Sequence, residues 1–246
     1  MGKLAFLFPG QGAQVVGMGK DFFDAYDHAK KRFAEADEAL GYSISKLCFE
    51  GPADQLQLTE HTQPAILTVS VIAAELLRAE GIAPEIAAGH SLGEYSALVL
   101  AGVLSFQDAV VLVHKRGAYM QEAVPVGEGA MAAVIGLDDE SIVAVCAEAS
   151  AAGAVQAVNF NCPGQTVIAG TAKGVETAVQ MLQEKGAKKA VILPVSAPFH
   201  STLMEPAAKK LAAELDKVQL HDAVFPVVSN YTGGLQQRAA EIKANI

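Results

Sequence analysis

The run Gly-His-Ser-Leu-Gly at residues 89–93 constrains the fold of this chain more than any other stretch. It follows an apolar segment, residues 86–88, and precedes a helix-forming segment, residues 95–103. A Gly-x-Ser-x-Gly run between a strand and a helix is typical of a sharp turn, in which glycines keep side chains clear and the serine hydroxyl is raised into a cleft. The pattern therefore predicts an α/β fold with Ser91 as a candidate nucleophile.

The same serine has a second interpretation. Ser91 and Glu94 form a Ser-x-x-Glu pattern, which matches a capping box at the start of a helix. In that case the hydroxyl would bind a backbone N–H group and do no chemistry. Five residues of pattern leave both interpretations open, so the choice depends on the rest of the chain.

Composition and charge narrow the class of protein. The chain has 246 residues, 51% of them hydrophobic, which is enough for one globular unit or for a large domain with a smaller insert. Glu75 interrupts the longest apolar run well short of the roughly 18 residues that a membrane span needs. The net charge of −9 argues against nucleic-acid binding, and an acidic partner would need a local basic patch. We therefore expect neither a membrane nor a nucleic acid as a partner.

The cysteines and the N-terminus indicate a compartment. Cys48, Cys146 and Cys162 are widely spaced, which predicts neither a disulfide framework nor a metal-binding pair. The apolar run before Pro9 has no cleavage-like small-residue site, so it indicates a first strand rather than a signal peptide. We expect a cytoplasmic monomer.

The first half of the chain alternates between strands and helices. Residues 3–8 predict a buried strand, residues 85–88 predict the strand that leads into the elbow, and helices are predicted over 21–40, 62–79 and 105–122. The loop 10–14 is rich in glycine but has neither Gly-x-Gly-x-x-Gly nor a Walker lysine. Its backbone N–H groups therefore suit an oxyanion better than a phosphate chain.

The second half changes character. Strands are predicted over 130–135, 155–159, 166–169 and 189–193, with helices over 138–149 and 172–184. This order of strand, helix, strand, strand, helix, strand is that of a ferredoxin-like unit. Residues 125–197 are therefore predicted to form a small domain inserted into a larger one, made of residues 1–124 and 198–246.

An arginine lies on an apolar helix face. Ala109, Val113, Arg116 and Met120 are three or four residues apart, so they share one side of a helix. Such an arginine either extends to water or is neutralised by an anion. A structural ion pair with a core carboxylate and a two-bond grip on a substrate carboxylate both remain open.

A nucleophilic serine needs a base within hydrogen-bond reach. The candidates are His28, His61, His90, His114, His200 and His221. His90 adjoins Ser91 in a turn where successive side chains diverge, and His114 is two residues from Arg116 and so faces another way. Position favours His200, in the loop where the inserted unit returns to the main body and a cleft is expected. The alternative for His200 is an imidazole on a surface loop.

Four motifs together carry a family resemblance. They are FPGQGAQ at 8–14, GHSLGEYSAL at 89–98, KRGAYMQ at 115–121 and APFHS at 197–201. In this order and spacing they closely resemble the malonyl-CoA:acyl carrier protein transacylases of fatty-acid and polyketide synthesis, as do TQPA at 62–65 and NFNCPGQTVIAG at 159–170. The resemblance implies an α/β-hydrolase-like large domain with a parallel sheet, interrupted by a smaller ferredoxin-like α+β domain.

The resemblance also implies roles for individual residues. Ser91 would be the nucleophile and His200 its base. The backbone N–H groups of Gln11 and Leu92 would form the oxyanion hole, and Arg116 would bind the free carboxylate of the malonyl group. The implied reaction moves malonyl from malonyl-CoA to the phosphopantetheine thiol of acyl carrier protein through a malonyl-serine, with no metal and no redox cofactor.

The resemblance has less specific implications for Gln63, Phe199 and the C-terminal part of the fold. Gln63 matches a polar residue near the site, and Phe199 resembles the bulky residue that excludes a methyl group on the acyl α-carbon. Family members continue several tens of residues past Ile246, and that part includes a loop carbonyl that orients the histidine. A serine thioesterase or esterase is the alternative. That class shares the elbow but gives no reason for Arg116, and it expects an acid between serine and histidine, where none stands out.

Overall fold

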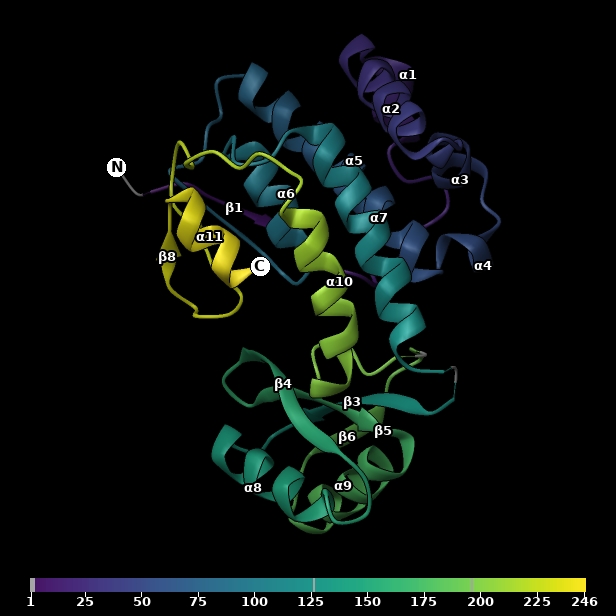
Figure 1. Cartoon of the computed structure of the whole chain (residues 1–246), viewed down its shortest axis with the longest axis vertical. Helices are drawn as coiled ribbons and strands as arrows, with labels where there is room; N and C mark the ends of the chain where they lie inside the picture. Colours follow the sequence, from purple (N-terminus) through teal and green to yellow (C-terminus); the bar gives the residue numbers. More distant parts are fainter. Residues whose placement is uncertain (1–2, 126, 196) are drawn as a thin grey trace. The chain divides into compact units, whose positions relative to one another are not determined.

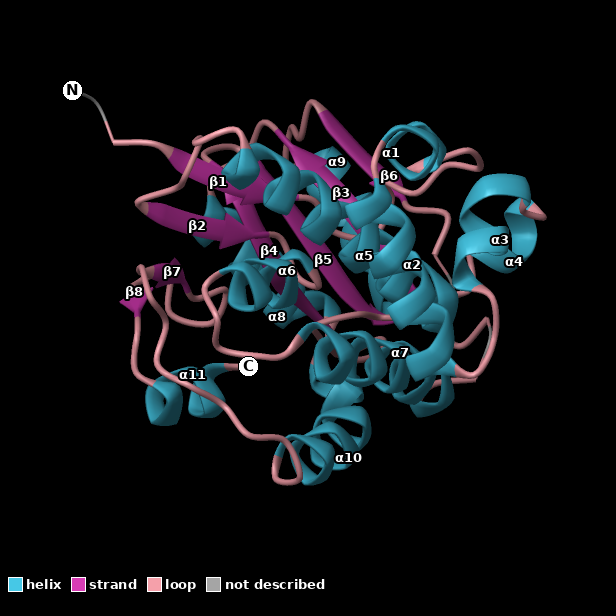
Figure 2. Cartoon of the chain, turned by 90° about the horizontal axis from the view of Figure 1, so that it is seen from above, coloured by secondary structure: helices cyan, strands magenta, loops and turns pink. Residues whose placement is uncertain are grey.

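A computed structural model describes residues 3–125, 127–195 and 197–246 (Figures 1 and 2). The chain divides into two compact units, Met1–Ala118 with Leu211–Ile246, and Tyr119–Lys210. The boundaries fall inside two helices, α7 (Phe106–Ala123) and α10 (Glu205–Leu215). Each unit holds a four-stranded sheet with helices around it, which confirms the predicted α/β class.

The sheet of the first unit has the order β1 (Ala5–Phe8), β2 (Ile86–Gly89), β7 (Val227–Val228), β8 (Leu235–Gln236). The first three strands are parallel, with Phe8 opposite Gly89, whereas β8 runs antiparallel to β7. The parallel sheet that the resemblance implied is therefore present in β1, β2 and β7 but not in β8, so this sheet is mixed. A tight connection through Gly233, at φ 68°, returns the chain beside β7 and forces the antiparallel pairing.

Strand β1 is less buried than predicted. Only Phe8 is buried, and the side chain of Leu7 is 77% exposed. The prediction of a buried strand is wrong because β1 pairs with β2 alone, so its other edge is open. An apolar cavity of about 460 Å³ lies along this strand and is lined by residues of β1 and α5 (Thr59–Ala79), among them Phe6 and Ile66.

The helices of the first unit differ from the prediction at their ends. They are α1 (Lys20–Ala25), α2 (Asp27–Leu40), α3 (Ile44–Glu50), α4 (Ala53–Leu56), α5, α6 (Gly93–Leu100), most of α7, the end of α10 and α11 (Ala239–Asn245). The single helix predicted over 21–40 is two helices, because Tyr26 adopts an extended backbone with φ −129° and ψ 125°. Helix α5 begins at Thr59, three residues before the predicted start at 62.

The second unit has the predicted order of elements. These are β3 (Gly129–Ile135), α8 (Asp139–Ala149), β4 (Val155–Cys162), β5 (Gln165–Thr171), α9 (Ala172–Glu184) and β6 (Lys189–Ile192), followed by the 3-10 turn η1 (Thr202–Met204). The sheet order is β4-β5-β3-β6, and all three pairings are antiparallel.

Alternate residues of the strands in this unit face opposite layers. Ala132, Val134 and Ile168 pack with residues of α8 and α9, which Figure 1 shows on one side of the sheet. Met131 and Val167 pack instead with Met120, Phe199 and other residues of the same unit.

The three cysteines are free, with Cys48 and Cys146 buried and Cys162 exposed. Within the described ranges, no helix is long and apolar enough to cross a membrane.

Candidate active site

Ser91 lies in the predicted sharp turn between β2 and α6. Its φ of 52° is in the left-handed region, which is costly for a residue other than glycine. The flanking glycines are required because a Cβ on Gly89 would lie 1.9 Å from the backbone carbon of Gly93, and one on Gly93 would lie 2.4 Å from the carbonyl oxygen of Phe8. The elbow geometry predicted from the pattern is therefore present.

The capping-box alternative for Ser91 is wrong. Helix α6 has Leu92 as its N-cap, without a side-chain cap hydrogen bond. The carboxylate of Glu94 accepts hydrogen bonds from the backbone N–H of Asn230 and from Nε2 of Gln236, not from the serine. The N–H of Ser91, which a capping box would pair with the glutamate, donates instead to Oδ1 of Asn230.

The guanidinium of Arg116 binds two neutral side chains and contacts a third. Nη1 donates to Oε1 of Gln63 at 2.8 Å, and Nη2 donates to Oγ of Ser91 at 3.2 Å. The guanidinium carbon lies 5.6 Å from the centre of the Tyr95 ring. None of the ion pairs in the described part of the chain involves Arg116, so the alternative of a structural ion pair is not what these contacts show. The structure brings Ser91, Arg116 and Gln63 together, as their predicted roles require.

Close packing of α7 on the start of α5 positions this arginine. Pro64 has no N–H group, so it cannot bond to the carbonyl of Glu60 one turn earlier. Nδ1 of His114 on α7 donates to that carbonyl at 2.9 Å. A Cβ on Gly117 would lie 2.5 Å from the carbonyl oxygen of Thr59, so only glycine allows the two helices to approach this closely. His114 is thus a structural residue, and Arg116 projects beside it toward Gln63.

The loop that holds Gln11 lies against the elbow. The N–H of His90 donates to the carbonyl of Phe8 at 3.0 Å, and a Cβ on Gly10 would lie 2.6 Å from the carbonyl oxygen of His90. Gln11 follows directly, with Nε2 donating to Oγ1 of Thr59 at 3.3 Å. As the N-cap of α6, Leu92 has an N–H group without a partner inside the helix. Gln11 and Leu92 therefore lie at the same edge of the sheet, and their oxyanion role stays a prediction.

Asn230 is a contact of the elbow that the sequence did not reveal. Its Oδ1 accepts from the N–H of Ser91 at 2.9 Å, and its Nδ2 donates to the carbonyl of Gly89 at 2.7 Å. Asn230 lies 139 residues beyond Ser91, and pairing of β2 with β7 brings the two together. No local pattern could have identified it.

Glu94 is a buried carboxyl group next to this site. It is 4% exposed, and burial raises its pKa, while hydrogen bonds from Asn230 and Gln236 and the charge of Arg116 act in the opposite direction. Burial also raises the pKa of Tyr95, whose ring Arg116 contacts. Both groups lie in the first turn of α6, directly after the elbow.

His200 belongs to the second unit. It follows the buried Pro198 and Phe199 in a turn that the hydroxyl of Ser201 closes by donating to the carbonyl of Pro198 at 2.7 Å. Its φ is 63°, and in the described part of the chain His200 and Ser91 are the two non-glycine residues with positive φ. Such conformations cluster at functional sites. Phe199 is 8% exposed and packs with Met131 and Met204.

Among the residues that the structure describes, no group of three His, Cys, Asp or Glu side chains could hold a metal ion.

Comparison with known proteins identifies the family of this chain. Residues 5–244 match the family described as the acyl transferase domain. The malonyl CoA-acyl carrier protein transacylase of Bacillus subtilis (strain 168) is 53% identical over 247 aligned positions, which cover 100% of this chain and 78% of that protein.

Two solved structures are similar throughout. The malonyl CoA-acyl carrier protein transacylase of Coxiella burnetii has a TM-score of 0.96 and 43% identity, covering 99% of this chain and 77% of that one. A type II PKS acyl-carrier protein in complex with its malonyl-transacylase includes a chain with a TM-score of 0.95 and 46% identity, covering 99% of this chain and 79% of that one. The protein therefore belongs to the acyl transferase domain family, with relatives that are malonyl CoA-acyl carrier protein transacylases.

Proposed function

We propose that this protein transfers a malonyl group from malonyl-CoA to the phosphopantetheine thiol of acyl carrier protein. The observation that carries the proposal is the pair of hydrogen bonds from Arg116 to Ser91 and Gln63. They place a fixed cation next to the nucleophile, and malonyl differs from other short acyl groups by a free carboxylate at its far end. A guanidinium fork is suited to such a carboxylate. The printed names of the relatives agree with this substrate.

The first half-reaction acylates Ser91. Its Oγ attacks the thioester carbonyl, and the imidazole of His200, assigned from the APFHS motif, takes the hydroxyl proton. The N–H groups of Gln11 and Leu92 would hold the oxyanion, where one donor is worth about 3 to 4 kcal/mol. The C–S bond then breaks, and coenzyme A leaves as the thiol with the proton from His200.

The second half-reaction reverses this sequence with another thiol. The phosphopantetheine sulfur attacks the malonyl ester, His200 accepts the thiol proton and returns it to Oγ as the C–O bond breaks, and Ser91 is regenerated. Every step is an acyl or proton transfer, so we propose that the cycle uses no metal and no redox cofactor. The partner is acyl carrier protein, a class that forms a complex with the malonyl-transacylase of the similar structure.

The same contacts explain selectivity. An acetyl group would leave the guanidinium of Arg116 desolvated and without an anion, which disfavours short uncharged acyl groups. We also propose the finer architecture, an α/β-hydrolase-like domain interrupted by a ferredoxin-like one. The strand order β4-β5-β3-β6 and the order of elements in the second unit support the ferredoxin-like part.

Mass spectrometry after incubation with malonyl-CoA tests the proposal directly. We expect a malonyl adduct on the peptide that contains Ser91, removed when phosphopantetheinylated carrier protein is added. Ser91→Ala should give no adduct, and His200→Ala should form it slowly. An unmodified Ser91, or hydrolysis of malonyl-CoA that exceeds transfer with carrier protein present, would contradict it.

A further inference from the structure

We infer that Asn230 is a positioning residue, which holds the nucleophile elbow in its reactive shape. The inference concerns how Ser91 is presented, and it rests on the proposed function only for the identity of the acyl donor. The side chain of Asn230 bonds to backbone atoms of the turn rather than to the hydroxyl of Ser91, so its effect would be exerted through that backbone.

The side chain of Asn230 bridges the two ends of the turn. Its oxygen accepts from the N–H of Ser91 at 2.9 Å, and its amide nitrogen donates to the carbonyl of Gly89 at 2.7 Å. The acceptor oxygen and the donor nitrogen of the amide are therefore both bound to the backbone of the turn, at Ser91 and at Gly89. Ser91 holds φ 52° at this point, a conformation that persists only when the surroundings enforce it.

A second set of contacts holds Asn230 itself. Its backbone N–H donates to Oε2 of Glu94 at 3.2 Å, and Oε1 of Glu94 accepts from Gln236 at 2.8 Å. Gln236 in turn accepts from Asn245 of α11 at 2.9 Å. The chain of hydrogen bonds thus runs from the last helix through the buried Glu94 to the elbow.

This arrangement also selects the oxyanion donor. Because the N–H of Ser91 is bound to Asn230, it is not available to an oxyanion. The next N–H along the chain, that of Leu92, lies at the start of α6, where no intrahelical acceptor uses it. Asn230 therefore occupies the N–H of Ser91 and leaves the N–H of Leu92 available to an oxyanion.

The test compares Asn230→Leu with a matched control. Leucine keeps the size of the side chain and removes both hydrogen bonds. Gln237→Leu is the control, because Gln237 also donates to a backbone carbonyl, that of Ala223 at 3.2 Å, but does not contact the elbow. Rapid quench and mass spectrometry measure two rates, that of Ser91 labelling by a fluorophosphonate and that of Ser91 acylation by malonyl-CoA. Steady-state kinetics gives the KM for malonyl-CoA.

We expect Asn230→Leu to slow both labelling and acylation by about tenfold or more while the KM changes by less than about threefold. Gln237→Leu should stay within about twofold of the parent. Labelling of Asn230→Leu at the rate of the control would overturn the inference. Because the fluorophosphonate needs no malonyl group, slow labelling in a protein that never accepts malonyl would sustain the inference and refute the proposed function.

Asn230→Asp provides a second measurement if the leucine variant does not fold. Its carboxylate still accepts from the N–H of Ser91, but when ionised it faces the carbonyl of Gly89 with no proton to donate. Protonation restores an O–H donor. The ratio of labelling rates, Asn230→Asp to parent, should therefore rise as the pH falls, and a ratio that does not change with pH would overturn the inference.

Discussion

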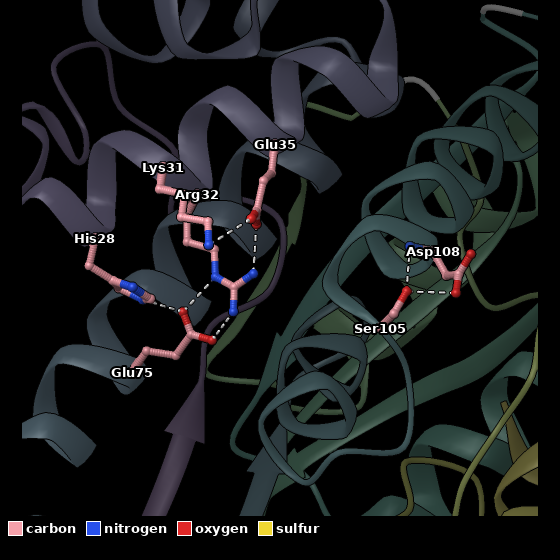
Figure 3. A network of polar contacts seen from close by, with 7 residues as sticks. All are labelled: His28, Lys31, Arg32, Glu35, Glu75, Ser105 and Asp108. Atoms are coloured by element: carbon pink, nitrogen blue, oxygen red, sulfur yellow. Dashed lines mark hydrogen bonds and ion pairs between the residues drawn. The ribbon is translucent and has the colours of Figure 1, made fainter.

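Two arginines of the first unit have similar burial but different partners. Arg116 donates to the neutral oxygens of Gln63 and Ser91. Arg32, on α2, donates to the carboxylates of Glu75 at 2.6 Å and Glu35 at 2.6 Å, as Figure 3 shows. Each guanidinium also lies over an aromatic ring, Arg116 over Tyr95 and Arg32 over Phe106.

Arg32 forms structural ion pairs with Glu35 and Glu75. A structural ion pair of this kind was one of the two interpretations left open for Arg116 by the sequence. Hydrogen bonding to Glu75 raises the pKa of Arg32 further. His28 also bonds to Glu75, at 2.7 Å (Figure 3), so two elements, α2 and α5, are tied together there. A guanidinium with two carboxylates is satisfied, whereas one held by neutral oxygens keeps its charge for an incoming anion. The kind of partner therefore separates a stabilising arginine from a binding one.

Replacement of Arg116 by alanine should give the largest effect. Loss of two charge-assisted hydrogen bonds to the malonyl carboxylate is expected to lower kcat/KM for malonyl transfer about 10³-fold. Fluorophosphonate labelling of Ser91 should change by less than about tenfold, because it involves no carboxylate. Equal turnover of malonyl and acetyl donors by both the parent and the variant would contradict the binding role of Arg116.

Lysine substitutions at positions 116 and 32 test the same difference between the two arginines. Lysine keeps the charge but lacks the planar fork, so Arg116→Lys should lower kcat/KM for malonyl-CoA by about 10- to 100-fold. Arg32→Lys should leave kcat/KM within about twofold, since the ion pair does not touch substrate. Steady-state kinetics with both variants measures this, and a large activity loss in Arg32→Lys at full folding would show that the two sites are coupled.

Arg32→Met should instead affect stability. Both partners are about one-fifth exposed, so the loss is expected to be about 1 to 3 kcal/mol in the free energy of unfolding, below that of a fully buried pair. Urea denaturation followed by circular dichroism gives this value. Lys20→Met, which removes an exposed ion pair with Asp24, is the control and should cost less than about 0.5 kcal/mol. An Arg32→Met protein as stable as this control would remove the structural role assigned to Arg32.

The smallest expected effect is a pH dependence of stability. Burial acts to raise the pKa of Glu75, but hydrogen bonds from Arg32 and His28 outweigh it and hold the pKa below its ordinary value of 4.5. A lowered pKa in the folded state contributes stability above pH 4.5, and this contribution is lost as the pH falls through the folded value. The stability difference between the parent and Glu75→Gln should therefore shrink below pH 4.5 in thermal melts. A difference that grows on acidification would show the opposite sign.

Much of the architecture was predictable from local pattern. The elbow needs glycine where a Cβ would collide with backbone, so five residues were enough to place a strand, a turn and a helix. Local patterns likewise predicted the four strands β3 to β6 of the second unit and the helices α8 and α9 between them. Arg116 stood out because an arginine interrupts an apolar helix face. The domain limits at 125 and 197 and the roles of His200, Gln11 and Leu92 remain predictions.

Local sequence patterns were enough to predict the turn at Ser91, the order of elements in the second unit and the candidate nucleophile, because these depend on backbone torsions and on residues a few positions apart. Only the tertiary structure decided the rest: the exposure of β1, the neutral partners of Arg116 and the contact of Asn230 with Ser91. Each depends on which segment lies beside another after folding. A contact between residues 139 positions apart is set by strand pairing and helix packing, and no local pattern of residues records it.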